Sequence, residues 1–254
     1  MSKDFIHKLR CFRHYFWYLH QIIYFNFHYL PFHQAKHLPI WVKFRNGVRH
    51  KFNTGTIKIE SETISFGMIE LGVLQYYEEK EGIFFANYGT LIFKGAAHIS
   101  NGCDIQVYNH AKLIIGDGVG MSKTKITCAK EIEIGRGTFI GVGTKFIDSD
   151  FHPIIDIFGK CYLNPSQSIR IGEYNWLGAD VLVTKGARTP NHCIISARSV
   201  INKKYKIPEC TIINNATGQE VIMEGYIRDR NITYLKRGAS RKIEDFDNYI
   251  KTLI

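Results

Sequence analysis

The sequence predicts an all-β protein built as a parallel β-helix, and two observations carry this prediction. One apolar position recurs every six residues between Ile171 and Ile201, and the residue two places before it is usually small or β-branched. A period of six fits a short strand plus a turn, three of which close one triangular coil, and it matches neither a helix nor a plain strand. Both sets are expected to point inward: Ile171, Leu177, Val183, Thr189, Ile195 and Ile201, with Ile169, Val181, Ala187, Cys193 and Ser199.

Weaker copies of the same register occur upstream. One runs through Ile134, Ile140 and Phe146, and earlier groups are Phe93, Ile99 and Ile105, then Ile115 and Met121. The phase slips between these groups, which indicates bulges or short loops. We therefore expect on the order of five or six coils between about Leu91 and Ile213, each resting only on its neighbours.

The segments that flank the repeats differ from them in pattern. Residues 1–38 are predicted to be a helical segment, because an apolar stripe with spacings of four and three runs through Phe5, Leu9, Phe12, Phe16, Leu19 and Ile23. Pro31 is expected to end this amphipathic helix. The helix either caps the open end of the coil or lies as a basic, aromatic-rich helix on an anionic membrane surface. Residues 39–220 form the β-helix domain, and residues 221–254 form a tail with a short polar helix after Arg241.

Composition narrows the functional classes. The chain has 254 residues and a net charge of +10, but Lys and Arg are scattered among the predicted strands, which argues against a nucleic-acid interface. No apolar run reaches the length of a membrane span, and Lys8, Arg10 and Arg13 interrupt any signal-peptide pattern. We expect a cytoplasmic protein, with the inner face of the membrane as a second possibility. Six cysteines without CxxC spacing predict reduced thiols and no metal site.

The repeat breaks once, between Ile147 and Ile169. A long loop that leaves a rigid solenoid usually carries function. His152 stands at the base of this loop (residues 148–168), directly after two carboxylates and before a proline. Its position makes His152 the first candidate for a catalytic residue.

These residues together resemble the hexapeptide-repeat acyltransferases, which are left-handed parallel β-helices. The resemblance covers roughly residues 90 to 220 and rests on the segments Asp148-Ser149-Asp150-Phe151-His152-Pro153-Ile154, Ile169-Arg170-Ile171-Gly172-Glu173-Tyr174-Asn175-Trp176-Leu177-Gly178-Ala179, Lys185-Gly186 and Ser196-Ala197. Within that family the chain is most similar to bacterial capsule and surface-polysaccharide O-acetyltransferases. The resemblance implies a homotrimer with acetyl-coenzyme A between neighbouring chains, a carbohydrate acceptor and no metal.

The resemblance also implies roles for individual residues. His152 would be the general base, since imidazole titrates near working pH. Asp150 or Asp148 would orient its ring, and Asn109 from a neighbouring coil is an equal contender. Trp176 would donate its indole N–H to the developing oxyanion. The alternative for Trp176 is a shield over the corner of a coil or the trimer seam.

The coenzyme would lie along small residues. The residues expected to admit the pantetheine arm are Gly178, Ala179, Ser196 and Ala197, and those expected to meet the nucleotide phosphates are Lys203 and Lys204. The alternative for the lysines is a solvated exit from the coil.

Other functions share this fold. An N-acyltransferase of an amino sugar would use the same donor, and a non-enzymatic β-helix would serve as a scaffold. A β-helix carbonic anhydrase needs three zinc-binding histidines, and the loop region holds only His152. The family's usual closing motif is replaced by Asn214-Asn215-Ala216-Thr217-Gly218. The sequence therefore does not identify the acceptor sugar or the hydroxyl that is acetylated.

Overall fold

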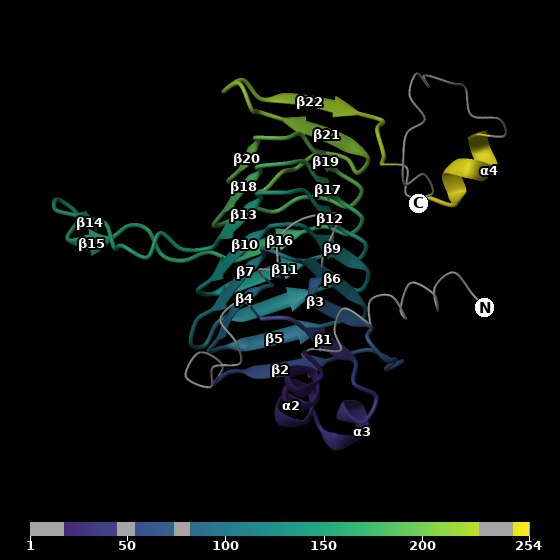
Figure 1. Ribbon diagram of the computed structural model, residues 1–254. Helices are drawn as coiled ribbons and strands as arrows, with labels where there is room; N and C mark the ends of the chain where they lie inside the picture. The colour runs from purple at the N-terminus through teal and green to yellow at the C-terminus, as the bar shows by residue number, and fades with distance from the viewer. Residues whose placement is uncertain (1–17, 45–53, 74–81, 229–245, 254) are drawn as a thin grey trace.

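In the computed structural model, short parallel strands stack into a three-sided prism, and the structure describes residues 18–44, 54–73, 82–228 and 246–253 (Figure 1). The strands fall into three sheets, which we call faces I, II and III in the order in which the chain visits them. Face I contains β1 (Ile40–Val42), β3 (Ile69–Val73), β6 (Ala97–Ser100), β9 (Val119–Met121), β12 (Phe139–Ile140), β17 (Trp176–Leu177), β19 (Ile194–Ile195) and β21 (Thr211–Asn214).

The other two faces repeat the same arrangement. Face II contains β4 (Phe84–Asn87), β7 (Asp104–Val107), β10 (Lys125–Cys128), β13 (Lys145–Ile147), β18 (Leu182–Thr184) and β20 (Val200–Ile201). Face III contains β2 (Thr56–Ile59), β5 (Thr90–Phe93), β8 (Lys112–Ile115), β11 (Glu131–Ile134) and β16 (Ile169–Ile171). The corner between faces II and III therefore lies across the prism from face I.

The hexads fill the interior as the sequence predicts. Every position of the main register and every small residue two places before it is buried, from Ile169 to Ile201. One inward position holds an amide: the Asn175 side chain donates to Thr189 Oγ1 at 2.7 Å and accepts from the backbone N–H of Cys193 at 2.6 Å. Burial of this amide is tolerated because its hydrogen bonds are made inside the prism.

The coils begin earlier than the expected start near Leu91. Strands β1, β2 and β3 already occupy faces I and III, and Ile40 pairs in register with Ile69. A register shift between Leu71 and Val73 interrupts the count of six in this part of the chain. The expectation was wrong here because parallel pairing depends on the stacked strands and not on the number of residues between them.

The N-terminal end of the prism is closed by α2 (Leu19–Tyr29), followed by α3 (Phe32–Ala35) (Figure 1). Phe25 is fully buried, and its ring lies 5.3 Å from that of Phe44. The buried Asn26 donates to the carbonyl of Ile40 and accepts from its N–H, which ties the helix to β1. Capping is thus observed, but the buried side of α2 carries Phe25 and Asn26 while Ile23 of the expected stripe is exposed. Residues 1–17, with the rest of that stripe, lie outside the described residues.

At the opposite end the chain turns back. Strand β22 (Val221–Glu224) pairs antiparallel with β21 and so covers the last open strand of face I. The expected tail at residues 221–254 therefore opens with a strand. A short helix, α4 (Phe246–Lys251), follows near the C-terminus.

The loop at 148–168 is the one long departure from the coil among the described residues. It contains a two-stranded antiparallel hairpin, β14 (Ile155–Asp156) and β15 (Cys161–Tyr162). Figure 1 shows this hairpin projecting away from the prism. Its base lies at the corner between β13 and β16, which is the corner of faces II and III.

Candidate active site

His152 lies where the loop leaves the prism. Its side chain is exposed, and Phe151 before it has a left-handed backbone with φ of 60°. The Phe151 ring lies 5.1 Å from that of Tyr108, which comes from the same corner two coils earlier. The loop base is therefore supported by an aromatic contact that the repeat pattern does not reveal.

Asp148 holds the corner together and does not orient the histidine ring. The side chain is fully buried, and its two oxygens accept the backbone N–H groups of Ala129, Lys130 and Glu131 at 2.7, 2.8 and 2.8 Å. A carboxylate with three such bonds is a structural cap for the preceding coil. The expectation that Asp148 could orient His152 is therefore replaced by a structural role.

Asp150 is exposed and organises the loop backbone. Its Oδ2 accepts from Lys185 Nζ at 2.5 Å and from Asn164 Nδ2 at 2.9 Å, and Asn164 Nδ2 also donates to the carbonyl of His152 at 2.9 Å. The hydrogen bond from Lys185, then that from Asn164, holds the pKa of the Asp150 carboxyl below its usual value. Asn164 and Lys185 thus join the site, although no spacing in the sequence distinguishes Asn164 from other loop residues.

The imidazole of His152 has no hydrogen-bond partner among the residues that the structure describes. It faces a hollow of about 300 Å³ between the two legs of the loop. The hollow is lined by Ser149, Phe151, His152, Pro153, Tyr162, Asn164, Pro165 and Ser166. Asn109, the other expected orienting residue, is exposed at the corner two coils earlier and forms no hydrogen bond with the His152 ring in the described structure. A ring without a hydrogen-bond partner in the described part of the chain could contact a substrate or a second chain.

Trp176 lies on the outside of face I. It pairs with Phe139 on one side and Ile194 on the other, and 40% of its surface is exposed. The ring of Phe139 is also exposed and lies 4.9 Å from the guanidinium of Arg228. The indole of Trp176 is therefore presented outward from the sheet and not toward the core.

The predicted small residues adjoin Trp176 at the corner of faces I and II. Gly178 and Ala179 stack directly beneath Ser196 and Ala197, because Leu177 and Ile195 pair in register. A Cβ on Gly178 would lie 2.7 Å from the backbone nitrogen of Ala197, so the stacking itself requires glycine there. Ala179 and Ala197 are exposed, and this corner is open to a narrow ligand.

The two predicted lysines occupy a different corner. Lys203 and Lys204 follow β20 at the corner of faces II and III. The backbone of Lys204 forms an isolated parallel β-bridge with that of Arg188. Both side chains are exposed, and Lys203 forms an ion pair with Glu220 at 2.7 Å. They lie at the same corner as the loop and not at the small-residue corner.

The predicted residues thus fall into two groups within one chain. The loop group, at the corner of faces II and III, holds His152, Asp150, Lys203 and Lys204. The face I group holds Trp176, Gly178, Ala179, Ser196 and Ala197. Trp176 lies on face I, across the prism from the loop group, and the four small residues lie at the corner of faces I and II, which is a different corner from that of the loop.

No cluster of three or more potential metal ligands occurs in the described part of the chain. Five cysteines lie in that part, and none forms a disulfide. Burial raises the pKa of the Cys103 and Cys193 thiols to about 11, so both are held as neutral core residues.

The sequence comparison gives one partial match of interest. No protein-family profile matches the chain. A segment of 86 residues is 30% identical to a polysialic acid O-acetyltransferase of Neisseria meningitidis, which represents 33% of this chain and 36% of that protein. The aligned segment therefore spans little more than a third of the length of this curated relative.

The structural comparison extends over most of the chain. The crystal structure of the polySia-specific acetyltransferase NeuO matches 80% of this chain and 85% of its own, with a TM-score of 0.50 and 21% identity. The chain has the fold of this acetyltransferase. A second crystal structure, of the polysialic acid O-acetyltransferase OatWY, matches 79% of this chain and 80% of its own with a TM-score of 0.41 and 18% identity.

Proposed function

We propose that the protein is an acetyl-coenzyme A-dependent O-acetyltransferase that acts on a sugar hydroxyl of a bacterial surface polysaccharide. The observation that carries the proposal is the exposed imidazole of His152, which faces a hollow and has no partner among the described residues. It occurs on a fold shared with a polySia-specific acetyltransferase. The partial identity with a polysialic acid O-acetyltransferase supports a sialic-acid-containing acceptor.

In the proposed reaction His152 accepts the proton of the acceptor hydroxyl. The oxygen then attacks the thioester carbonyl carbon, the carbon–sulfur bond breaks, and the imidazolium returns the proton to the departing thiolate. Trp176 donates its indole N–H to the carbonyl oxygen as negative charge develops there. Asp150, Asn164 and Lys185 are positioning residues, because their bonds fix the loop backbone on either side of His152.

The site is proposed to form between chains. The loop group of one chain would face the face I group of the next, and a homotrimer of left-handed coils would repeat this contact three times. The loop tip supports a contact with a second copy, since Ile157, Phe158 and Tyr162 are 75, 90 and 70% exposed. Such a run of exposed apolar side chains is costly unless it is covered.

The two groups also fit the parts of the co-substrate. Ala179 and Ala197 leave room beside Trp176 for the pantetheine arm. Lys203 and Lys204 carry the positive charge that a nucleotide phosphate requires, and a phosphate that binds Lys203 would replace its ion pair with Glu220. Because the lysines belong to the loop group, the coenzyme would cross from one chain to its neighbour.

The direct test is acetyl transfer by a His152→Ala variant. Loss of a general base lowers the rate by on the order of 100- to 10,000-fold. The matched control is His110→Asn, which should leave the rate unchanged. His110 is exposed at the corner of faces II and III two coils earlier, and asparagine tolerates its φ of 63°. Full activity of His152→Ala with an intact thermal transition would contradict the assignment.

The products decide which atom is acetylated. Mass spectrometry of a panel of oligosaccharides and amino-sugar nucleotides, before and after mild alkali, separates a labile ester from a stable amide. An alkali-stable product would replace the proposal with N-acylation.

A further inference from the structure

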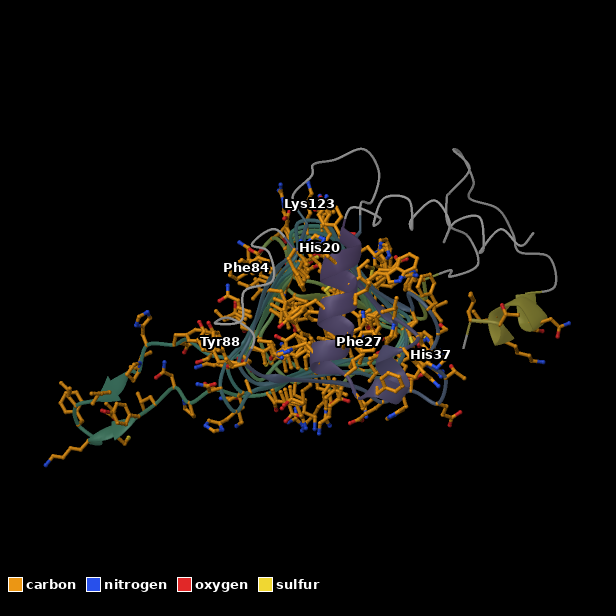
Figure 2. All side chains as sticks on the ribbon, turned by 60° about the horizontal axis from the view of Figure 1, so that its bottom comes forward. His20, Phe27, His37, Phe84, Tyr88 and Lys123 are labelled. Atoms are coloured by element: carbon orange, nitrogen blue, oxygen red, sulfur yellow. The ribbon has the colours of Figure 1, made fainter. Side chains whose placement is uncertain are left out.

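The outer surface of the N-terminal cap is apolar. On α2 and α3 the exposed large side chains are Ile23, Tyr24, Phe27 and Phe32, and Phe32 is 72% exposed. We call these four residues the cap face. Figure 2 shows α2 lying across the end of the prism, with Phe27 and His37 labelled near one end of the helix and His20 near the other.

The cap face is separate from the side of α2 that closes the prism. Ile22 and Phe25 belong to the buried core, whereas the rings of Phe27 and Phe32 lie 6.2 Å apart on the exposed side. The internal packing of the cap is therefore complete without the four exposed residues. Exposed aromatic rings such as those of Phe27 and Phe32 are typical of a contact surface.

The stretch of sequence that contains the cap is one-sided in charge. Between Phe5 and Ile59 the sequence contains nine Lys and Arg, seven of the 11 His, and no Asp or Glu. The remaining 24 of the 33 Lys and Arg balance all 23 Asp and Glu almost evenly. Nearly the whole net charge of +10 thus belongs to the stretch of chain that contains the cap.

We propose that the cap face docks on an anionic lipid bilayer. Phe27 and Phe32 would enter the interface between headgroups and acyl chains, with the exposed Lys36 at the headgroups. The exposed His20, His33 and His37 belong to the same two helices and the turn after them, and they would offer further hydrogen-bond donors to phosphates. The described residues contain no helix long and apolar enough to cross a bilayer.

The charge distribution favours lipid over a second copy of the chain. Two copies placed cap to cap would bring together two stretches of sequence that each carry a net positive charge between residues 5 and 59. An anionic bilayer supplies the missing negative charge, and each basic residue near it contributes favourably. The inference stands independently of the acetyl transfer proposed above.

The test is sedimentation of the full chain with vesicles of phosphatidylcholine alone and of phosphatidylcholine mixed with phosphatidylglycerol. The protein should pellet with the mixed vesicles, remain in the supernatant with the neutral ones, and dissociate at high salt. The Phe27→Ser/Phe32→Ser variant should bind the mixed vesicles at least about tenfold more weakly, because both anchoring rings are lost. Lys36→Glu should also weaken binding.

The matched control removes two exposed apolar side chains at the other end of the prism. Val221→Ser/Met223→Ser lies on β22, where Val221 is 43% and Met223 is 38% exposed, and it should bind as the unmodified protein does. Equal binding by the cap-face variant, or no binding of the unmodified protein to anionic vesicles, would overturn the proposal. Light scattering without lipid gives a further test. If the unmodified protein forms an oligomer that the cap-face variant does not form, a second copy covers the cap face and the lipid proposal is overturned.

Discussion

Mixing two inactive variants tests whether the catalytic groups meet between chains. His152→Ala removes the proposed base from the loop group, and Trp176→Phe removes the indole N–H from the face I group while keeping an aromatic ring. In the isolated chain these two side chains leave opposite sides of the prism. A chain carrying either change alone should be inactive, since every site in its oligomer lacks one group.

The expected recovery follows from counting sites. In a cyclic trimer each site takes His152 from one chain and Trp176 from the next, so random mixing of equal amounts leaves about one quarter of the sites intact. If mixed trimers are isolated with two different affinity tags, each has a single intact site, which is about one third of the full activity. The base alone accounts for on the order of 100- to 10,000-fold in rate, so this recovery is far above the background of either variant.

The assay is acetyl transfer by co-expressed variants, with subunit composition confirmed by native mass spectrometry. Mixing His152→Ala with the double variant His152→Ala/Trp176→Phe is the control, because no combination of those chains restores an intact site. Activity of verified mixed trimers that does not exceed that of the single variants would refute a site shared between chains. An active monomer would refute it as well.

Three further predictions concern groups around the site. Asp148→Ala should lower the free energy of unfolding by about 3 kcal/mol or more, because three buried backbone N–H groups lose their acceptor. Calorimetry measures this change, and the control Asp150→Ala, at an exposed carboxylate, should change the free energy of unfolding little. The hydrogen bond from Lys185 lowers the pKa of Asp150 in the folded state. The stability that this ion pair contributes is therefore complete above pH 3.8, the usual pKa of the carboxyl group, and it is lost as the pH falls through the lowered pKa. Carbon-13 NMR should place the Asp150 midpoint below 3.8 and Lys185→Met should raise it; an unchanged midpoint would remove Lys185 as the cause. The exposed Cys161 should react with iodoacetamide well before Cys193, whose pKa burial raises to about 11, and peptide mass spectrometry reads the order; early labelling of Cys193 would contradict the buried register.

The hexad register predicts the interior well because each buried position has a local cause. Leu177, Val183 and Ile195 point inward since the six-residue unit sets which side of each short strand faces the core. The register does not predict the burial of Asn175. That burial depends on hydrogen bonds with Thr189 and Cys193, which lie one coil later and become neighbours only when the coils stack. Periodicity gives the direction of a side chain but not its partner.

The same limit explains the buried side of α2. The spacing of apolar residues predicted Ile23 as a packing residue, yet Asn26 is buried and Ile23 is 43% exposed. Asn26 forms a two-way hydrogen bond with the backbone of Ile40, a long-range contact that overrides the apolar stripe. A helix that caps a β-helix meets exposed backbone groups at the end strand, so a polar side chain on its inner face is favourable there.

The placement of the catalytic candidates depends on counting faces. The chain leaves face II after Ile147, re-enters on face III at Ile169 and reaches face I at Trp176. Each hexad advances the chain by one face. Trp176 comes one face after β16 and therefore lies on face I, across the prism from the corner of faces II and III where the loop departs. His152 and Trp176 are therefore close in sequence but separated by the buried core, and no change of loop conformation brings the base of the loop around to face I. The proposed chemistry needs both groups at one carbonyl, and the geometry of three faces then requires the second group to come from another chain.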